Sequence, residues 1–294
     1  MPEPKRKMRD DYRLLDSGNL CKLEQAGPYR LVRPALNAFW RPTLNSREWD
    51  AADAIFERQS TGGGVWTWKH GLRQPAEGDW IVRWGEVNFM VKPTHFGHLG
   101  FFAEQIGNWA WLRESSALLP PESDTLNLFA YSGGATFAMA QGGANVCHLD
   151  ASRGIIDWAN KNQALNHDLK GSIRWICDDA MKFVAREQRR GHKDRGIVLD
   201  PPSFGRGAQG QVWKIESDIA DLLASVRAIL DTSGRFFILL TCHSPGFSAF
   251  SLGRMVEQAF PDFAAQVESG EMLIPETSAE GRALPAGLFA RLRN

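Results

Sequence analysis

The sequence predicts a mixed α/β protein in which a Rossmann-like, mostly parallel sheet follows a small β-rich domain. From about residue 125 onward, short apolar segments typical of buried strands alternate with longer amphipathic segments typical of helices. Before about residue 95, short β-like segments follow one another directly, with turn residues between them. We therefore expect a β-rich domain over residues 1–95 and a Rossmann-like domain over residues 96–294.

The β-rich part is predicted from strand-length segments that each end in a turn signal. The expected strands cover residues 12–15, 20–23, 29–32, 80–84 and 87–91. Gly85 and Glu86 stand between the last two and predict a hairpin. The same part is rich in tryptophan, which either stacks on unpaired bases or fills a small core. Both interpretations stay open, and we expect this domain to recognise a substrate.

The second part shows the alternation that typifies a doubly wound sheet. A helix is expected over residues 101–119, before a break at Pro120 and Pro121. Apolar strands are expected at residues 125–130, 144–149, 172–176, 196–199 and 235–240. Helices are expected near residues 136–142, 153–166, 180–190, 216–230 and 247–259. This order predicts a mostly parallel sheet with helices on both faces.

The chain has 34 basic and 34 acidic residues, so its net charge is zero and the molecule as a whole does not attract a polyanion. Contact with nucleic acid must then be local. Basic residues cluster at Lys5, Arg6, Lys7 and Arg9, and again between residues 186 and 195. Arg189 and Arg190 of the second cluster are candidates for substrate binding, although a solvated helix face explains them as well.

The four cysteines are widely spaced, and they form no CxxC motif. Such usage is typical of reduced thiols in the cytoplasm, and no metal site is expected. The chain also lacks an apolar run of about 20 residues that would span a membrane. We therefore expect a cytoplasmic protein that does not insert into membranes.

A glycine-containing loop follows the first strand of the expected parallel sheet. In such sheets, ligands bind outside the carboxyl ends of the strands, so the residues after each strand are informative. Gly133 and Gly134 allow the backbone to approach a ligand, while a plain tight turn remains an alternative. The GxGxxG pattern of dinucleotide-binding folds is absent, which disfavours NAD or FAD.

Acidic residues follow the next three strands. Asp150, followed by Ala151, is placed to accept hydrogen bonds from ribose hydroxyls, or else it caps a helix. An acid at the third strand end could accept from an adenine amino group, and the fourth strand ends in Asp200. The third and fourth strands are followed by Asp178, Asp179 and Ala180, and by the sequence DPPSF at residues 200–204.

The order of these motifs resembles that of class I S-adenosylmethionine-dependent methyltransferases. The matching segments are LNLFAYSGG at 126–134, LDAS at 149–152 with ANKN at 159–162, DDA at 178–180 and DPPSF at 200–204. The closest resemblance is to bacterial enzymes that methylate carbon 5 of cytosine in large-subunit ribosomal RNA. The resemblance implies S-adenosylmethionine as the cofactor and RNA as the partner.

The resemblance also implies which residues contact the cofactor. GFFAEQ at 100–105 is similar to a family segment that closes over the methionine part, with glutamate in place of the usual aspartate. The implied cofactor-binding residues are Gln105, Phe129, Tyr131, Gly133, Gly134, Asp150, Ala151, Asp178, Asp179, Ala180, Asp200 and Pro201.

For the chemistry, the resemblance implies Cys242 as a nucleophile and Asp200 as its partner at the edge of the base. A thiolate that adds to cytosine makes carbon 5 nucleophilic. An inert buried thiol is the alternative for Cys242, which lies in TCHS at 241–244. A second candidate reaction is transfer to a nitrogen, with Asp200 accepting from the amine and Phe204 stacking on the base. A third candidate is a catalytically idle, cofactor-binding protein associated with RNA.

Overall fold

The computed structural model describes residues 10–60, 62–206, 212–278 and 281–294, which fall into two compact units. The first unit comprises the residues up to Ala103 together with Ile274–Leu284. The second comprises Glu104–Leu273 and Pro285–Asn294. The basic residues at positions 5–9 lie outside the described residues. The sequence placed the boundary at 95/96, and it did not indicate that a late segment returns to the first unit.

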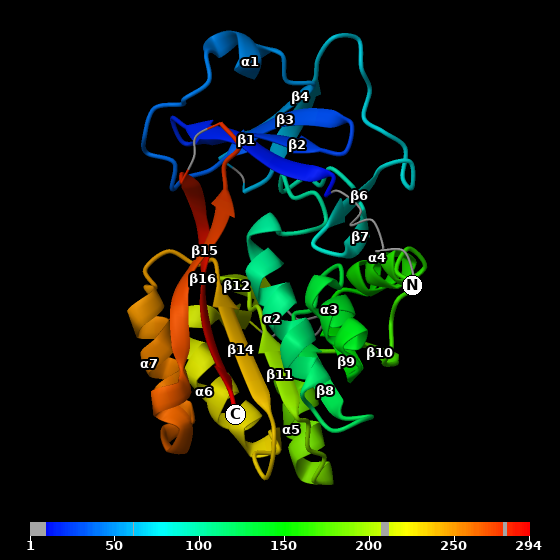
Figure 1. Cartoon of the computed structure of the whole chain (residues 1–294), viewed down its shortest axis with the longest axis vertical. Coiled ribbons are helices and arrows are strands. Elements are labelled where there is room, and N and C mark those ends of the chain that lie inside the picture. Colours follow the sequence, from blue (N-terminus) through cyan, green and yellow to red (C-terminus); the bar gives the residue numbers. More distant parts are fainter. Residues whose placement is uncertain (1–9, 61, 207–211, 279–280) are drawn as a thin grey trace, which may run out of the picture. The chain divides into compact units, whose positions relative to one another are not determined.

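The first unit contains a five-stranded sheet in the order β1-β2-β3-β4-β5. Neighbouring strands are antiparallel except β3 and β4, which run parallel across the connection that holds the short helix α1. The bounds are β1 (Tyr12–Gly18), β2 (Cys21–Ala26), β3 (Tyr29–Pro34), α1 (Ser46–Asp50), β4 (Ala54–Arg58) and β5 (Gly64–Trp68). A separate hairpin of β6 (Ile81–Trp84) and β7 (Val87–Met90) lies at the predicted position (Figure 1).

Aromatic rings and one buried acid form the core of the first unit. The ring of Tyr12 packs edge-on against Trp84 and Phe101, with centroids 5.1 and 5.5 Å apart. The Tyr12 hydroxyl also donates to Glu24, which is fully buried and forms an ion pair with Arg33. Burial alone would raise the pKa of Glu24, but Arg33 and other donors lower it to about 2. Trp80 and Trp84, two of the six tryptophans before residue 95, are buried and therefore serve packing.

The second unit is built on a seven-stranded sheet in the order β10-β9-β8-β11-β14-β16-β15. The first five of these strands are parallel, and β16 joins β14 in an antiparallel direction. The strands are β8 (Asp124–Leu128), β9 (Asn145–Asp150), β10 (Ile173–Cys177), β11 (Gly196–Leu199), β14 (Phe237–Cys242), β15 (Glu268–Pro275) and β16 (Ala283–Arg293). A small hairpin of β12 (Phe204–Arg206) and β13 (Val212–Lys214) follows β11.

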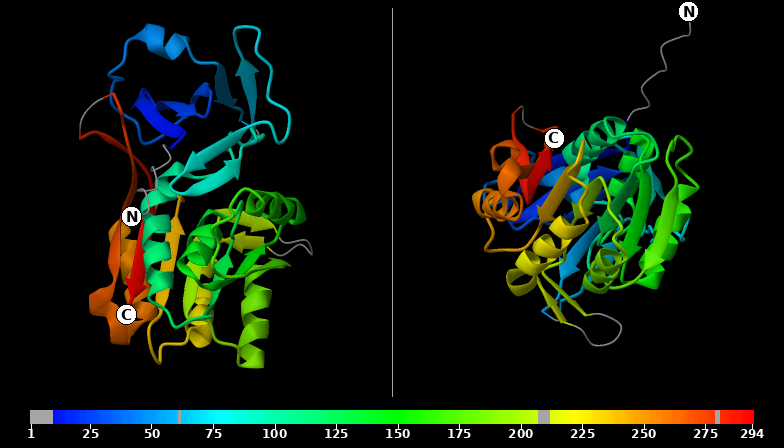
Figure 2. Two further views of the ribbon diagram at one scale, coloured as in Figure 1. Left: turned by 45° about the vertical axis from the view of Figure 1, so that its right-hand side comes forward. Right: turned by 90° about the horizontal axis from the view of Figure 1, so that it is seen from below.

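Helices cover both faces of this sheet, as the alternating pattern predicts (Figures 1 and 2). They are η1 (Ala103–Gln105), α2 (Ile106–Ala117), α3 (Gly134–Gly142), α4 (Arg153–Gln163), α5 (Ala180–Arg190), α6 (Ile215–Ile229), α7 (Ala249–Ala259) and η2 (Pro261–Gln266). Helix α2 packs on α3, whereas α5 and α7 both pack on α6. The Rossmann-like fold is confirmed.

The two faces of β14 contact different layers because side chains alternate along a strand. Ile238, Leu240 and Cys242 belong to one buried cluster with residues of α6 and α7. Phe237, on the other face, packs edge-on against Trp111 of α2. Within the described residues, the structure contains no helix long and apolar enough to cross a membrane and no cluster of metal-ligating side chains.

Candidate active site

The loop after β8 has a backbone that few sequences could adopt. Phe129, Tyr131 and Gly133 have positive φ angles of 58°, 49° and 103°. A Cβ on Gly133 would lie 2.7 Å from the ring of Phe137, and one on Gly134 would lie 2.5 Å from the ring of Trp109. The two glycines therefore allow α3 to begin directly under the loop, at the carboxyl edge of the sheet.

Asp150 fixes this loop to the end of β9. Its Oδ2 accepts a hydrogen bond from the amide of Tyr131 at 3.2 Å, and its Oδ1 accepts from the amide of Ser152 at 2.9 Å. Burial raises the pKa of Asp150, although these amides partly oppose the shift. The amide of Ala151 also donates to Asp150, so about one of the roughly four lone-pair positions of the carboxylate remains for a hydroxyl group of a ligand.

The acids after β10 have two different local roles. Asp179 caps α5 by accepting from the amide of Lys182 at 3.0 Å. Asp178, just before α5, forms an ion pair at 2.7 Å with Arg186 in the middle of that helix. Both acids lie at the carboxyl end of β10, which is hydrogen-bonded to β9 from Ile173 to Cys177. The structure thus brings Asp150, Asp178 and Asp179 to one edge of the sheet.

Asp200, directly after β11, lies at the centre of a polar cluster. Its Oδ1 accepts from the hydroxyl of Thr241 at 2.6 Å, and its Oδ2 accepts from the amide of Gln105 at 3.3 Å. Gln105 also donates to Thr241 at 3.2 Å and accepts from Asn108 at 2.8 Å. Gln105 is 7% exposed, so it is a rigid part of the site.

His243 links Asp200 to a second acid, Glu104. Its Nδ1 lies 3.3 Å from Oδ1 of Asp200, and its Nε2 lies 3.2 Å from Oε1 of Glu104. Burial by itself would lower the pKa of His243, but the two carboxylates outweigh it and raise the pKa well above 6.5. Burial opposes ionisation of Asp200, yet its pKa is lowered, chiefly by His243. The two neighbouring carboxylates therefore favour the protonated form of His243.

Cys242 makes no hydrogen bond to this cluster, and its role as a nucleophile beside Asp200 stays a prediction. Thr241 and His243 both contact Asp200, so the alternation along β14 turns the side chain between them to the opposite face. There Cys242 is fully buried in the cluster formed with α6 and α7. Burial also raises the pKa of its thiol.

The remaining part of DPPSF leads into the β12–β13 hairpin. Phe204 begins β12 and is 51% exposed, so its ring is accessible at the edge of the site. Trp213 of β13 holds the hairpin against the prolines, because its indole N–H donates to the carbonyl of Pro202 at 2.7 Å. Its ring also contacts that of Phe129, with centroids 5.4 Å apart. The loops after β8 and β11 are thus joined.

Arg189 and Arg190 lie away from these acids. Helix α5 starts at Asp179, on the carboxyl edge of the sheet, and ends at the two arginines, about 16 Å along its axis. The chain after α5 reaches the opposite edge, where the amide of Arg195 donates to the carbonyl of Asp124 at the start of β8. Arg190 is also paired with Glu187 at 2.9 Å. This location does not support a role in binding the substrate at the cofactor edge.

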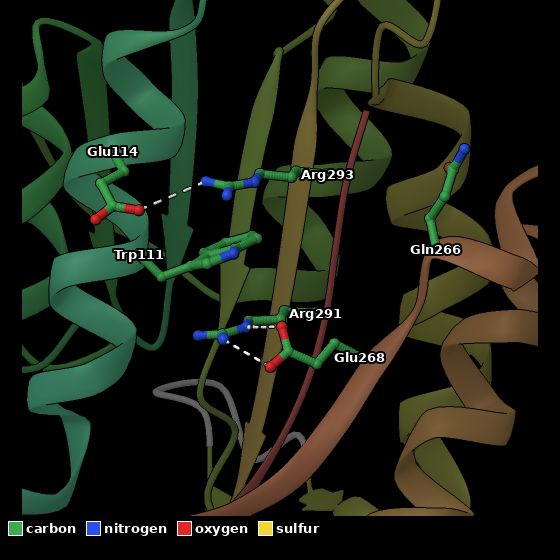
Figure 3. Close-up of a pocket in the computed structure, with 6 residues that line it drawn as sticks. All are labelled: Trp111, Glu114, Gln266, Glu268, Arg291 and Arg293. Atoms are coloured by element: carbon green, nitrogen blue, oxygen red, sulfur yellow. Dashed lines mark hydrogen bonds and ion pairs between the residues drawn. The ribbon is translucent and has the colours of Figure 1, made fainter.

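A separate pocket of about 450 Å³ lies between α2 and the last two strands (Figure 3). Trp111 lies between Arg291 and Arg293, and the two arginines pair with Glu268 at 2.9 Å and with Glu114 at 3.8 Å. In the register of β14 and β16, these arginines lie opposite Leu239 and Phe237, away from the carboxyl end of β14. The pocket is charge-balanced and is not part of the acidic edge.

Comparison with known proteins decides the family. The sequence pattern of the S-adenosylmethionine-dependent methyltransferases matches residues 68–248, more than half of the chain. The chain belongs to this family. It is therefore an S-adenosylmethionine-dependent methyltransferase, and the sequence-based predictions of the family, the fold and the cofactor are confirmed.

The methyltransferase resembles proteins of two kinds. A solved structure of an S-adenosylmethionine-dependent methyltransferase from Agrobacterium tumefaciens is 40% identical, with a TM-score of 0.87 over 97% of this chain and 90% of that one. Among curated relatives, the ribosomal RNA large subunit methyltransferase K/L of Alteromonas mediterranea is 31% identical over 66% of this chain and 26% of its own length. The corresponding methyltransferase I of Aeromonas hydrophila is 26% identical over 74% of this chain and 53% of its own length. The chain thus spans between a quarter and about half of these relatives.

The groups at the carboxyl edge fit the chemistry of S-adenosylmethionine. The ribose is suited to Asp150, which keeps about one lone-pair position for a hydroxyl group, and the adenine is suited to the acids after β10. The glycine loop permits close approach of the backbone, and Asp200 offers a negative charge for the cationic end of the cofactor. When bound, the cofactor supplies an electrophilic methyl group.

Four polar residues of the site were not assigned from sequence. Thr241 and His243 lie on either side of Cys242 in the sequence. Glu104 precedes Gln105, and Asn108 donates a hydrogen bond to it. The signal for Thr241 and His243 was their spacing of two along a strand. That spacing places both on the face that carries Asp200.

Proposed function

We propose that this methyltransferase modifies a base of large-subunit ribosomal RNA and that the acceptor atom is a nitrogen positioned by Asp200. The RNA class is supported by the curated relatives, which are named as large-subunit ribosomal RNA methyltransferases. The acceptor is supported by the polar cluster around Asp200. Such a substrate would place the enzyme in the cytoplasm.

The contacts of Asp200 leave it one position for an acceptor base. Thr241, His243 and Gln105 occupy three of the roughly four lone-pair positions of the carboxylate. The side chain of Asp200 keeps 26% of its surface exposed, so a substrate can reach it. An amino group of a base carries N–H donors, and one of them can fill the remaining position.

In the proposed reaction, Asp200 orients the amine so that its lone pair faces the methyl group. A carbon–nitrogen bond forms as the methyl–sulfur bond breaks, and the proton of the amine passes to solvent water. Because the pKa of Asp200 is lowered, the carboxylate accepts the hydrogen bond without retaining the proton. Phe204, half exposed after the two prolines, is available to stack on the base.

The carbon-5 reaction through Cys242 has less support from the geometry. It requires a thiolate in contact with the base, whereas the thiol is fully buried on the other face of β14 and its pKa is raised. Transfer to nitrogen uses only groups that already face Asp200.

The test is the identity of the methylated nucleoside. Unmodified large-subunit ribosomal RNA is incubated with the enzyme and labelled S-adenosylmethionine, digested to nucleosides and analysed by mass spectrometry. We expect label in one nucleoside methylated on nitrogen. Label in 5-methylcytidine would overturn the nitrogen acceptor, and transfer to protein or small molecules but not to RNA would overturn the RNA substrate.

A further inference from the structure

A pocket of about 580 Å³ lies within the first unit, beside α1 and the turn between β1 and β2. Its size is within the range of pockets that bind small ligands, about 300–1,000 Å³. Its lining includes Asn19, Cys21 and Val32 from the β1–β3 segment, and Arg41, Leu44 and Trp49 from the segment after β3. None of these residues belongs to the site at the carboxyl edge of the second unit.

The wall that contains Trp49 is held in place by one buried acid. Asp16 is fully buried and accepts hydrogen bonds from the amides of Thr43 and Leu44, at 3.1 and 2.8 Å. Its Oδ2 also accepts from the indole N–H of Trp49 at 3.1 Å. The ring is therefore fixed at its N–H edge. A half-buried indole that is fixed in this way loses little conformational entropy when a ligand binds.

The approach of two backbone segments closes one end of the pocket. A Cβ on Gly18 would lie 2.4 Å from the backbone nitrogen of Pro42, so only glycine lets the segment after β3 lie directly against the end of β1. Gly18 and Pro42 both line the pocket. The pocket is thus a product of the fold, and it does not depend on the conformation of a single side chain.

The lining combines an aromatic ring with positive charge. Trp49 offers a flat surface, and Leu44, Val32 and the neutral thiol of Cys21 add apolar surface. Arg41 is exposed and supplies a guanidinium, whereas no residue of the lining carries a carboxylate. A flat aromatic ligand with an attached anion complements these features, and a nucleotide of single-stranded RNA has both parts.

We propose that this pocket binds an unpaired base of the RNA substrate, with the base stacked on Trp49 and an adjoining phosphate paired with Arg41. The proposal rests on the proposed function, because it takes the substrate to be RNA. The pocket then recognises RNA at a site other than the base to be methylated. Asn19 and Ser46, which also line it, offer hydrogen-bonding groups to the edge of the base.

The first test separates binding from catalysis in the enzyme with both of its units. With unmodified large-subunit ribosomal RNA as substrate, Trp49→Leu should raise KM by about 5- to 150-fold, the range for loss of one base stack on an aromatic ring. Arg41→Gln should reduce the slope of log KM against log salt by about 0.7, the value for one phosphate contact in a single strand. Neither variant should change kcat or the affinity for S-adenosylhomocysteine.

Two nearby residues outside the lining serve as matched controls. Phe39 is an aromatic residue that is 81% exposed, and Arg47 is an exposed arginine of α1. Phe39→Leu and Arg47→Gln should leave KM and its salt dependence close to those of the wild type. The proposal is overturned if Trp49→Leu and Arg41→Gln behave like these controls. Arg41 is exposed, so its variant tests the pocket even if Trp49→Leu folds poorly.

A second readout is independent of methyl transfer. Cys21 lines the pocket, so a single-stranded homopolymer of uridylate or adenylate should slow its alkylation, measured by mass spectrometry of the intact chain. Arg41→Gln should weaken that protection, and Arg47→Gln should not. Unchanged alkylation of Cys21 at saturating homopolymer would overturn the pocket. Protection of Cys21 in an enzyme that methylates no RNA would instead overturn the proposed function and retain the pocket.

Discussion

Nδ1 of His243 lies 3.3 Å from Oδ1 of Asp200, and its other ring nitrogen lies 3.2 Å from Glu104. This arrangement of one cation between two carboxylates explains why Asp200 stays ionised although burial opposes its charge. It also fixes the orientation of the carboxylate, which accepts further hydrogen bonds from the hydroxyl of Thr241 and the amide of Gln105. His243 is thus a positioning residue for the acid at the centre of the site.

The first prediction concerns the pH dependence that His243 gives to catalysis. Its raised pKa means that the imidazolium is present below that pKa and is lost as pH rises through it. We therefore expect kcat/KM of the wild type to fall at a pH well above 6.5. His243→Gln should lower kcat/KM about tenfold or more, since a hydrogen bond to a charged group contributes about 1.5–3 kcal/mol, and it should remove that alkaline fall.

Glu104 supplies the control for this prediction. Glu104→Gln removes one of the two carboxylates that raise the pKa of His243, so the alkaline fall should move to lower pH. Profiles of kcat/KM against pH for the three enzymes provide the check. An alkaline fall that is identical in all three would exclude His243 as its origin.

A second prediction concerns the cofactor. Asp150→Ala should weaken binding of S-adenosylhomocysteine by about 1.5–3 kcal/mol, because hydrogen bonds to a charged group are lost. Asp157→Ala is the matched control, since Asp157 lies on α4 and pairs only at the surface with Arg153 at 3.5 Å in the described structure. Titration calorimetry measures both variants. Equal affinity in the two would remove Asp150 from the cofactor site.

The third prediction follows from the position of Arg189 and Arg190. Because α5 carries them away from the carboxyl edge, replacing both with alanine should change KM for RNA by less than about twofold. The salt dependence of KM should also be unchanged. A clear rise in KM together with a flatter salt dependence would restore the role in substrate binding that the sequence suggested.

The fourth prediction concerns stability of the first unit. The pKa of Glu24 is about 2, so its contribution to stability is present above the ordinary pKa of about 4.5 and is lost as pH falls toward 2. This difference corresponds to about 3 kcal/mol. Glu24→Gln should lower the free energy of unfolding by about 3 kcal/mol at neutral pH. Denaturation with urea at several pH values should also show that the free energy of unfolding falls less steeply toward acid pH in Glu24→Gln than in the wild type. An equally steep fall in both proteins would contradict this role of Glu24.

Much of the fold could be predicted because apolar strands and amphipathic helices alternate between residues 124 and 259. The last two strands of the sheet were not predicted. In β15 the burial alternates only near its end, and β16 contains glycine and proline within a long run of half-buried residues. Strand β16 joins the sheet by pairing with β14, from which α7 and η2 separate it in the chain, and β15 lies beside β16 at the edge. Local patterns do not report the pairing of β16 with β14.

The site shows the same limit at the level of single residues. Strand ends identified Asp150, Asp178 and Asp200 because carboxyl ends of parallel strands share one edge. The sequence could not tell which face of β14 each residue of TCHS occupies, because the direction is set by the pairing with β11 and β16. Chemistry favoured the thiol of Cys242, whereas register places Thr241 and His243 beside Asp200.

The roles of Asp200 and Cys242 are separated by comparing Asp200→Asn with Cys242→Ala in one assay of methyl transfer to unmodified large-subunit ribosomal RNA. If Asp200 positions a nitrogen acceptor, Asp200→Asn should lose about 100-fold or more in kcat, which is in the range expected for loss of a charged group that acts in the transition state. Cys242→Ala should stay within about threefold of the wild type if it remains folded, as its melting temperature would report, because the thiol is fully buried and its pKa is raised. The opposite order, with a folded Cys242→Ala inactive and the wild type forming a covalent adduct with RNA containing 5-fluorocytosine, would contradict the account.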